Sequence, residues 1–222
     1  MPASPEHSAE RGFIIPIGGA EGKGKNPAIL SRFVTLCGGK NARIMVIPTA
    51  SLLNETGPAY KELFESLGAN AMCVPVENRE ECFDEEKERI LNGATGIFIT
   101  GGNQLRLSTI LGGTPVARRI RKLNAEGIHV AGTSAGAAIV SEHMIAGGRG
   151  GPSPRESGVV LAPGLAILLL ITVLAGCGGS HHHLVVHVIR CTDINHVNVV
   201  TLDDLAPIGF DRLVAPLGLE VQ

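Results

Sequence analysis

The chain has 222 residues, a length that suits one α/β domain with a substantial core and is short for two. Hydrophobic residues make up 44% and charged residues 18%, which is neither a disordered nor a fibrous composition. The formal net charge is -2, and the chain has one Tyr and no Trp. Neither nucleic acid nor an anionic membrane is therefore expected as a partner.

The beginning of the chain and its cysteines point to a reducing compartment. Residues 1–11 lack a basic start followed by an apolar run, so we expect a short disordered lead and no signal peptide. The five cysteines are odd in number and form no CxxC pair, which favours free thiols over disulfides or a metal site. We expect a cytoplasmic protein without a bound metal.

Apolar strand patterns alternate with helix patterns along the chain. The expected strands cover residues 13–19, 44–47, 71–76, 96–100 and 128–131, and the expected helices cover residues 27–37, 57–67, 80–91, 105–111 and 115–125. Short runs of branched apolar residues, such as 44–47, are typical of strands buried on both faces of a parallel sheet. The alternation predicts right-handed βαβ units, and hence an α/β fold with a doubly wound, mostly parallel sheet. Active groups of such folds gather beyond the carboxyl ends of the strands.

The hexapeptide GTSAGA, residues 132–137, follows the fifth expected strand and satisfies the pattern GxSxG. A serine on a sharp strand-to-helix turn projects its hydroxyl above the sheet, and its neighbours are small because the turn is crowded. The N–H of Ala135, at the start of the next helix, is suited to a developing oxyanion. The alternative is a serine that only caps a helix. The context favours Ser134 as the nucleophile of a serine hydrolase.

A second candidate element, GGNQ at residues 101–104, follows the fourth expected strand. Gly101 and Gly102 allow the backbone to approach a ligand, and one of their N–H groups can complete an oxyanion hole. The amide of Gln104 can donate to and accept from a peptide group. The alternative is an ordinary glycine loop with a solvated polar tip. Its position at the same sheet edge as Ser134 favours a functional role.

Six motifs, in order, resemble the cyanophycinase family of serine peptidases: PIGGAEGK, VIPTAS, GIFITGGNQLRL, LGGTP, GTSAGAA and SPRESGVVLAPGL. The resemblance implies a flavodoxin-like three-layer αβα fold, and hydrolysis of the β-Asp-Arg linkages of the polymer cyanophycin to dipeptides. It implies Ser134 as nucleophile, Gln104 in substrate binding, and the amides of Gly101, Gly102 and Ala135 as oxyanion donors. No metal or organic cofactor is implied, and a homodimer is implied by the resemblance alone. Aspartyl dipeptidases share the serine turn, so a small-peptide hydrolase is the alternative activity.

The resemblance ends near Leu165, although we treat residues 12–222 as a single α/β domain with an atypical C-terminal part. In the family, an Asp-Gln-His-Phe segment with the general base follows, and then an arginine-rich stretch; neither is present here. A serine nucleophile needs a base within hydrogen-bond reach. The sequence assigns neither this base nor the acidic partner, for which Glu156 is a candidate. The histidines beyond residue 165 are His181, His182, His183, His187 and His196.

Two further features of the C-terminal part bear on function. Without an HExxH glutamate, the His181–His183 run and His187 are interpreted as loop histidines rather than metal ligands. The apolar stretch at residues 166–177 is shorter than the ~20 residues that span a bilayer, so we expect a buried strand or core helix. Motifs, charge and composition all change near Leu165, which leads to the hypothesis of a frameshift in the coding sequence. A catalytically silent family member is therefore a third alternative.

Overall fold

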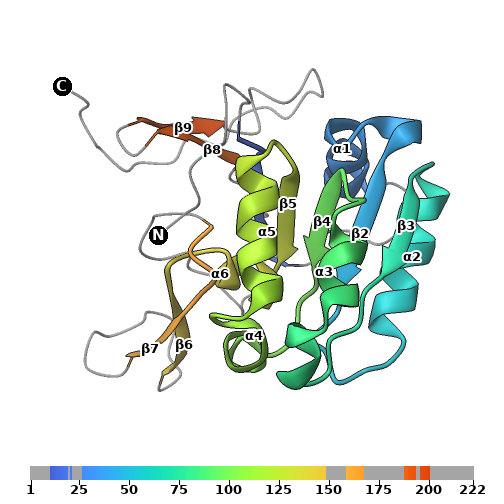
Figure 1. Cartoon of the computed structure of the whole chain (residues 1–222). Helices are drawn as coiled ribbons and strands as arrows, with labels where there is room; N and C mark the ends of the chain where they lie inside the picture. The colour runs from blue at the N-terminus through green and yellow to red at the C-terminus, as the bar shows by residue number, and fades with distance from the viewer. Residues whose placement is uncertain are drawn as a thin grey trace, which may run out of the picture.

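The computed structural model describes residues 11–19, 21, 27–148, 159–167, 188–193 and 196–200. A seven-stranded sheet has the order β3-β2-β4-β5-β1-β8-β9, and its first five strands are parallel (Figure 1). These are β1 (Ile14–Ile17), β2 (Arg43–Ile47), β3 (Asn70–Cys73), β4 (Gly96–Ile99) and β5 (His129–Thr133). The predicted mostly parallel α/β sheet is confirmed.

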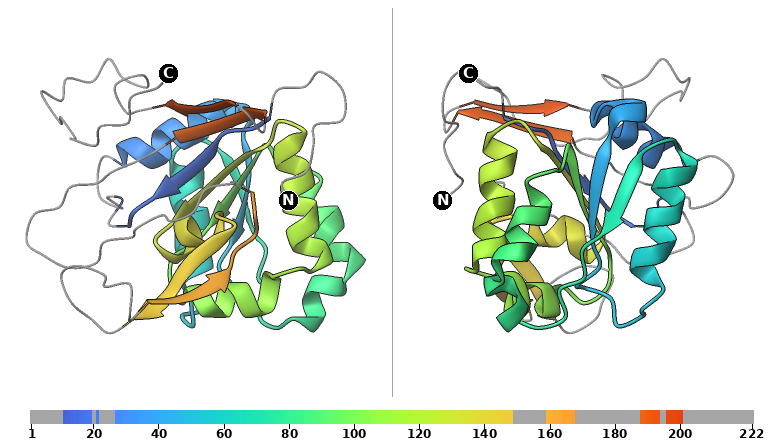
Figure 2. Two further views of the ribbon diagram at one scale, coloured as in Figure 1. Left: turned by 90° about the vertical axis from the view of Figure 1, so that its left-hand side faces the viewer. Right: turned by 45° about the vertical axis from the view of Figure 1, so that its right-hand side comes forward.

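Helices cover both faces of this sheet and complete three layers (Figure 2). One face carries α1 (Ala28–Leu36) and α2 (Thr56–Ser66). The other carries α3 (Glu85–Leu91), α4 (Gln104–Leu111), α5 (Pro115–Ala125) and the short α6 (Ala135–Ile139). Two 3-10 turns, η1 (Gly39–Asn41) and η2 (Glu80–Phe83), lie in the connections.

Alternate residues of each parallel strand supply the two halves of the core. In β2, Ile44 and Val46 belong to the cluster under α1 and α2, whereas Met45 and Ile47 belong to the cluster under α3 to α6. This alternation follows from the period of two in a strand, and burial on both faces explains the continuous apolar runs. Each large apolar side chain that is fully buried contributes roughly 1.5–3 kcal/mol to folding.

Antiparallel strands are added at the end of the chain. β6 (His143–Gly148) and β7 (Val159–Pro163) form a separate two-stranded sheet beside α4 and α6. β8 (Val188–Asp193) pairs antiparallel with β1, and β9 (His196–Val200) pairs with β8. These two strands extend the sheet with residues that lie beyond Leu165. The expected lead at residues 1–10 and the apolar stretch from residue 168 to 177 lie outside the described residues.

Several boundaries differ from the sequence-based expectations; for example, β1 ends at Ile17 and not at residue 19. Strand β3 ends at Cys73, not at residue 76, and Pro75 has no N–H for a sheet hydrogen bond. The helix expected at 80–91 is divided at Asp84, whose backbone is extended and whose carboxylate accepts from Glu86 N–H at 2.9 Å. Strand β5 continues to Thr133. Arg11, which we placed in the lead, is buried and donates to Asn124 Oδ1 at 3.2 Å, so it packs with the domain.

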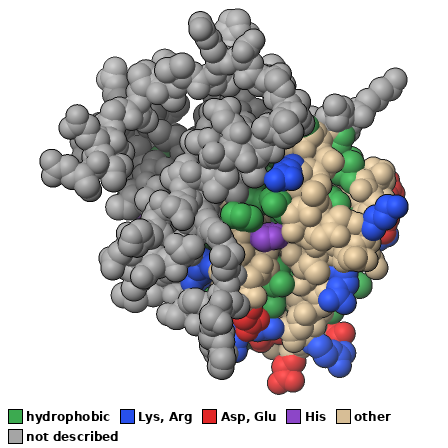
Figure 3. Space-filling view, turned by 90° about the horizontal axis from the view of Figure 1, so that it is seen from above, with side chains coloured by type: hydrophobic (Ala, Val, Ile, Leu, Met, Phe, Trp, Pro, Cys, Tyr) green, Lys and Arg blue, Asp and Glu red, His purple; other side chains and the backbone are tan. Residues whose placement is uncertain are grey.

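His129 lies at the amino end of β5, on the side of the sheet away from the carboxyl ends. Its Nδ1 accepts from Phe13 N–H at 2.9 Å, and the two rings stack with centroids 5.3 Å apart. Burial lowers the pKa of His129, and a hydrogen bond with the backbone of Leu36 opposes part of this shift. Figure 3 looks onto this end of the molecule, where a histidine lies among hydrophobic side chains. Among the described residues, no helix combines the length and apolar character needed to cross a membrane.

Candidate active site

Ser134 occupies a sharp turn between β5 and α6, with φ 51° and ψ −111°. Its N–H donates to Ile17 O at 2.8 Å, and its own carbonyl accepts from Ala137 and Ala138 N–H at 2.9 and 3.0 Å. A positive φ in a residue other than glycine costs about 1–3 kcal/mol and is typical of functional sites. The half-buried side chain makes no helix-capping hydrogen bond, so the structure does not support the capping alternative.

Two glycines in GTSAGA allow this turn because backbone atoms approach them closely. A Cβ on Gly132 would lie 2.1 Å from Gly136 O, and one on Gly136 would lie 2.1 Å from Ile99 O. Helix α6 therefore packs directly against the ends of β4 and β5. This contact is the physical reason for both glycines of the GxSxG pattern. Because α6 has only five residues, individual N–H groups, and not a helix dipole, are the donors suited to an oxyanion here.

Gly101 lies directly beside Ser134. A Cβ built on Gly101 would be 3.3 Å from Ser134 Cβ and 3.9 Å from its Oγ. The N–H groups of Gly101, Gly102 and Ala135 donate to no backbone carbonyl among the described residues. They are therefore free to donate to an oxyanion that forms next to Ser134 Oγ. The fourth- and fifth-strand motifs come together as the sequence suggests.

Gly102 fixes the GGNQ loop against the loop that follows β2. It has φ 143°, and a Cβ there would lie 2.2 Å from Ala50 O. The same carbonyl accepts from Asn103 N–H at 2.8 Å, and Asn103 Oδ1 caps α4 by accepting from Arg106 N–H at 3.1 Å. The loop thus has a defined path from β4 into α4.

Gln104 is the first residue of α4 and is half-buried. Its Nε2 donates to Ile145 O of β6 at 3.3 Å, so the donor half of the amide holds the β6–β7 hairpin. No hydrogen bond to its Oε1 is present within the described part of the chain. The acceptor half therefore remains for a ligand N–H.

The described residues provide no base for Ser134. His129 lies at the opposite end of β5, and the exposed His143 of β6 makes no hydrogen bond to Ser134 within the described part of the chain. Of the expected candidates, His181, His182, His183 and His187 lie outside the described residues, as does Glu156. His196 begins β9, and its side chain is not described. No group of three or more potential metal ligands occurs among the described residues.

The segment after β1 also contributes to the site, which the sequence interpretation did not predict. A Cβ on Gly19, at φ 104°, would lie 3.5 Å from Ser134 Cβ. Glu21 is buried, and its carboxylate accepts from Thr133 Oγ1 at 2.5 Å and from Tyr60 Oη. The paired glycines of PIGG after a buried strand were the available signal, because the same pattern in GGNQ did identify a site loop.

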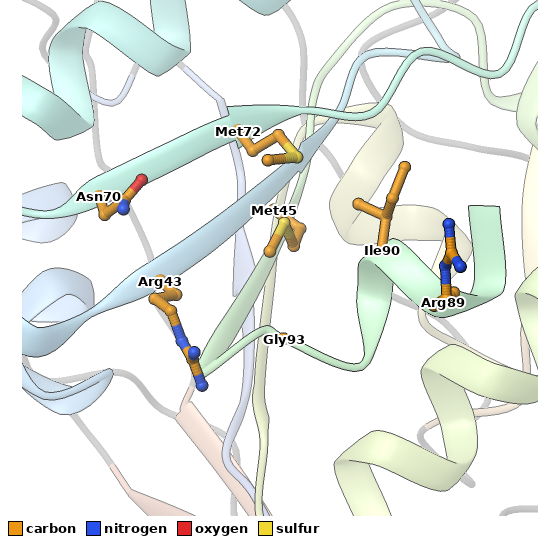
Figure 4. Close-up of a pocket in the computed structure, with 7 residues that line it drawn as sticks. All are labelled: Arg43, Met45, Asn70, Met72, Arg89, Ile90 and Gly93. Carbon is orange, nitrogen blue, oxygen red and sulfur yellow. The ribbon is translucent and has the colours of Figure 1, made fainter. Parts of the chain in front are cut away.

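A separate hollow of about 280 Å³ lies at the amino end of β2. Figure 4 shows that side chains from β2, β3 and α3 border it, among them Arg43, Met72 and Arg89. Parallel strands place this end opposite to Ser134, which follows the carboxyl end of β5. The hollow is therefore not part of the candidate site.

The fold and the Ser134 turn define an α/β protein with a GxSxG turn beyond the carboxyl ends of parallel strands. The family model for Peptidase family S51 matches residues 13–163, and the chain belongs to this family. The match ends two residues before Leu165, near which the expected resemblance stops.

Relatives in this family are cyanophycinases. The cyanophycinase of Synechococcus elongatus is 41% identical over 166 residues, which are 73% of this chain and 52% of that protein. The cyanophycinase of Geminocystis herdmanii (strain PCC 6308) is 41% identical over 161 residues, which are 71% of this chain and 59% of that protein. The chain thus spans between half and three fifths of the length of these relatives.

Solved structures with low sequence identity share the fold. A putative peptidase E protein from Listeria monocytogenes EGD-e has a TM-score of 0.57 at 19% identity, over 86% of this chain and 98% of that chain. A peptidase from an acI-B1 Actinobacterium has a TM-score of 0.53 at 24% identity, over 61% of this chain and 59% of that chain. These similarities support the three-layer α/β fold.

Proposed function

We propose that this chain is a serine-type peptidase that resembles cyanophycinase and hydrolyses cyanophycin to β-Asp-Arg dipeptides. The observation that carries the proposal is the positive-φ turn of Ser134 with Gly101 directly beside it, and with the N–H groups of Gly101 and Gly102 donating to no backbone carbonyl among the described residues. Membership of Peptidase family S51 and about 40% identity to cyanophycinases support the substrate class. The proposal includes a cytoplasmic location and a homodimer, and it requires no metal or organic cofactor.

In the proposed reaction, Ser134 Oγ attacks the α-carbonyl carbon of the peptide bond that joins one β-Asp-Arg unit of the polymer to the next. The carbonyl oxygen becomes an oxyanion that accepts from the N–H groups of Gly101, Gly102 and Ala135. The bond from this carbon to the α-amino nitrogen of the next aspartate breaks, and that nitrogen takes up the proton that left Oγ by way of a base, while the β-Asp-Arg linkages stay intact. Water then hydrolyses the acyl-enzyme. Gln104 Oε1 accepts an N–H of the substrate.

A fluorophosphonate probe tests the nucleophile, because it forms a covalent bond only with an activated serine. We expect the wild-type chain to be labelled and Ser134→Ala to lose labelling completely. Ser66→Ala is the matched control, because Ser66 is exposed on α2 and donates only to Leu63 O. Equal labelling of Ser134→Ala and wild type would contradict the assignment. A wild-type chain that resists the probe would instead be a catalytically silent family member.

Substrate assays separate the proposed activity from that of an aspartyl dipeptidase. We expect release of β-Asp-Arg from cyanophycin granules, measured by mass spectrometry, and no comparable turnover of Asp-X dipeptides. The reverse result would assign the site to a small-peptide hydrolase.

The frameshift hypothesis for the region after Leu165 is part of the same proposal, because it concerns the missing base. Translation of the other two frames of the gene beyond codon 165 is expected to give an Asp-Gln-His-Phe segment followed by arginines. If neither frame encodes it, the C-terminal part is a true divergence.

A further inference from the structure

A buried carboxylate lies directly behind the Ser134 turn. Glu21 is only 5% exposed, and each of its carboxylate oxygens accepts one hydroxyl: Oε1 accepts from Tyr60 and Oε2 from Thr133 Oγ1 at 2.5 Å. Burial of a carboxylate is unfavourable unless hydrogen bonds compensate, so a group placed here needs these two donors. An apolar side chain would fill the same space without that cost.

These contacts join three separate parts of the chain at the nucleophile turn. Glu21 follows β1, Tyr60 belongs to α2, and Thr133 is the last residue of β5. Thr133 is 2% exposed and pairs with Ile17 across the β1–β5 ladder. Tyr60 is itself fixed in the core, with its ring centroid 4.9 Å from that of Phe98. Glu21 thus connects the residue before Ser134 to a rigid part of the core.

The Ser134 turn depends on such support from its neighbours. A positive-φ conformation in a serine persists only where the surrounding structure holds it. Helix α6 is five residues long, and the Ser134 side chain makes no capping bond to it. The backbone bonds of Ser134 fix its N–H and carbonyl, but the preceding side chain, Thr133, is held through Glu21.

We propose that Glu21 is a positioning residue, which acts through the Thr133 hydroxyl to hold the Ser134 turn so that Oγ faces the amides of Gly101 and Gly102. Glu21 touches neither the substrate nor the reacting atoms. The effect of Glu21 on catalysis rests on the proposed function, whereas its effect on the conformation of the Ser134 turn does not. Burial raises the pKa of the Tyr60 phenol, and the hydrogen bond to Glu21 and its negative charge raise it further, in agreement with a closely coupled pair.

The test removes one hydroxyl without changing the shape of the side chain. Thr133→Val keeps the β-branch and loses the donor to Glu21, and Thr133→Ser restores a hydroxyl. Thr95→Val is the matched control, because Thr95 uses its hydroxyl at the amino end of β4, where it accepts from Arg43 N–H at 2.8 Å. Glu21→Gln keeps the size of Glu21 with a single acceptor oxygen.

Two measurements are made on the full-length variants. The first is the limiting rate of fluorophosphonate labelling of Ser134 at saturating probe, separated from probe affinity. The second is amide hydrogen exchange of Ser134, Ala137 and Ala138, whose N–H groups report on the turn. We expect Thr133→Val to lower the limiting rate about tenfold, which corresponds to about 1.4 kcal/mol, with probe affinity unchanged. We also expect faster exchange of the three amides.

The remaining variants distinguish positioning from simple stabilisation. Thr133→Ser is expected to recover the wild-type rate, and Thr95→Val to lose stability without any change in labelling or in these amides. As a single substitution, Glu21→Gln should lower the limiting labelling rate. In the Thr133→Val background it should have no additional effect, because both substitutions act through one contact. The proposal would be overturned if the effects of the two substitutions on the labelling rate were additive. It would also be overturned if Thr133→Val were labelled at the wild-type rate and its three amides exchanged at the wild-type rates. If the wild-type chain is not labelled, the proposed function fails, and the exchange measurement alone decides the role of Glu21.

Discussion

Gly102 shows how a single residue can determine the geometry of the site. It combines φ 143° with an approach of its Cβ position to 2.2 Å from Ala50 O, so an alanine there must displace the loop. We expect Gly102→Ala to lower the free energy of unfolding by about 1–3 kcal/mol and to slow labelling of Ser134. Urea unfolding and probe kinetics measure the two effects.

The matched control for this substitution is Gly113→Ala. Gly113 also has a positive φ, 72°, but nothing lies within 4 Å of its Cβ position. It should therefore show only the conformational cost of about 1 kcal/mol and normal labelling. Equal destabilisation of the two variants would mean that the contact with Ala50 has no energetic consequence.

Residue patterns predicted some parts of the site and not others, and the difference lies in sequence separation. Ser134, Gly101 and Gly102 were identified because local motifs follow strands whose carboxyl ends meet at one edge. Glu21 was missed because its contact with Thr133 spans 112 positions, and a single acidic residue in a glycine-rich loop gives no local signal. The general base could not be predicted, because the segment that would contain it does not match the pattern of the family.

At the scale of elements, Arg106 anchors α4 to the loops that follow β2 and β3. Its Nε donates to Thr49 O at 2.8 Å, and its Nη2 donates to Glu77 O at 2.9 Å. Hydrogen bonds from a charged donor contribute about 1.5–3 kcal/mol each in favourable cases. Arg106→Met keeps the apolar stem and loses both bonds. We expect it to lower stability by about 1–3 kcal/mol and to slow labelling, because Gln104 and the GGNQ loop begin the same helix.

Arg118→Met is the control for this substitution. Arg118 is exposed on α5 and donates to Gly113 O at 2.8 Å, away from the Ser134 turn. We expect normal labelling and a small loss of stability in urea unfolding. If Arg106→Met is labelled as fast as Arg118→Met, then α4 does not require this anchor to place the site loop.

The break between η2 and α3 could not be predicted from the sequence pattern. The charged stretch from residue 80 to 91 has a helical composition, yet Asp84 adopts an extended backbone and begins a new helix as its N-cap. An Asp can either continue a helix or end one turn and cap the next helix with its side chain. Composition alone does not decide between these two conformations. The element types were predicted well, because buried strands and amphipathic helices differ in period.

At the scale of the whole molecule, the strand alternation predicted a parallel sheet but not its order. The five parallel strands lie in the order β3-β2-β4-β5-β1, so the first strand of the chain lies next to the fifth. This places the exit of the first strand beside that of the fifth. For this reason Gly19 lies next to Ser134, and Glu21 contacts Thr133, although both residues are far from the GTSAGA turn in sequence.

His129 links the stability of the whole fold to pH from the end of the sheet that lies away from Ser134. Its Nδ1 accepts from Phe13 N–H, which requires a neutral ring, and burial lowers its pKa from the ordinary 6.5. Below pH 6.5 the unfolded chain therefore binds a proton that the folded chain does not yet bind. The contribution of His129 to the free energy of unfolding is thus complete above pH 6.5 and is lost as the pH falls from there through the folded-state pKa.

A comparison of variants isolates this contribution from that of other titrating groups. His129→Asn keeps an acceptor for Phe13 N–H and does not titrate, so its unfolding free energy should fall less between pH 8 and pH 5 than that of the wild type. His143→Asn, which replaces an exposed imidazole on β6, is the matched substitution for comparison. Urea unfolding of the three proteins at both pH values gives the slopes. Identical changes of the unfolding free energy with pH in His129→Asn and wild type would mean that folding does not lower the pKa of His129. His129 would then be protonated in the folded chain at pH 5, which its hydrogen bond from Phe13 N–H does not allow.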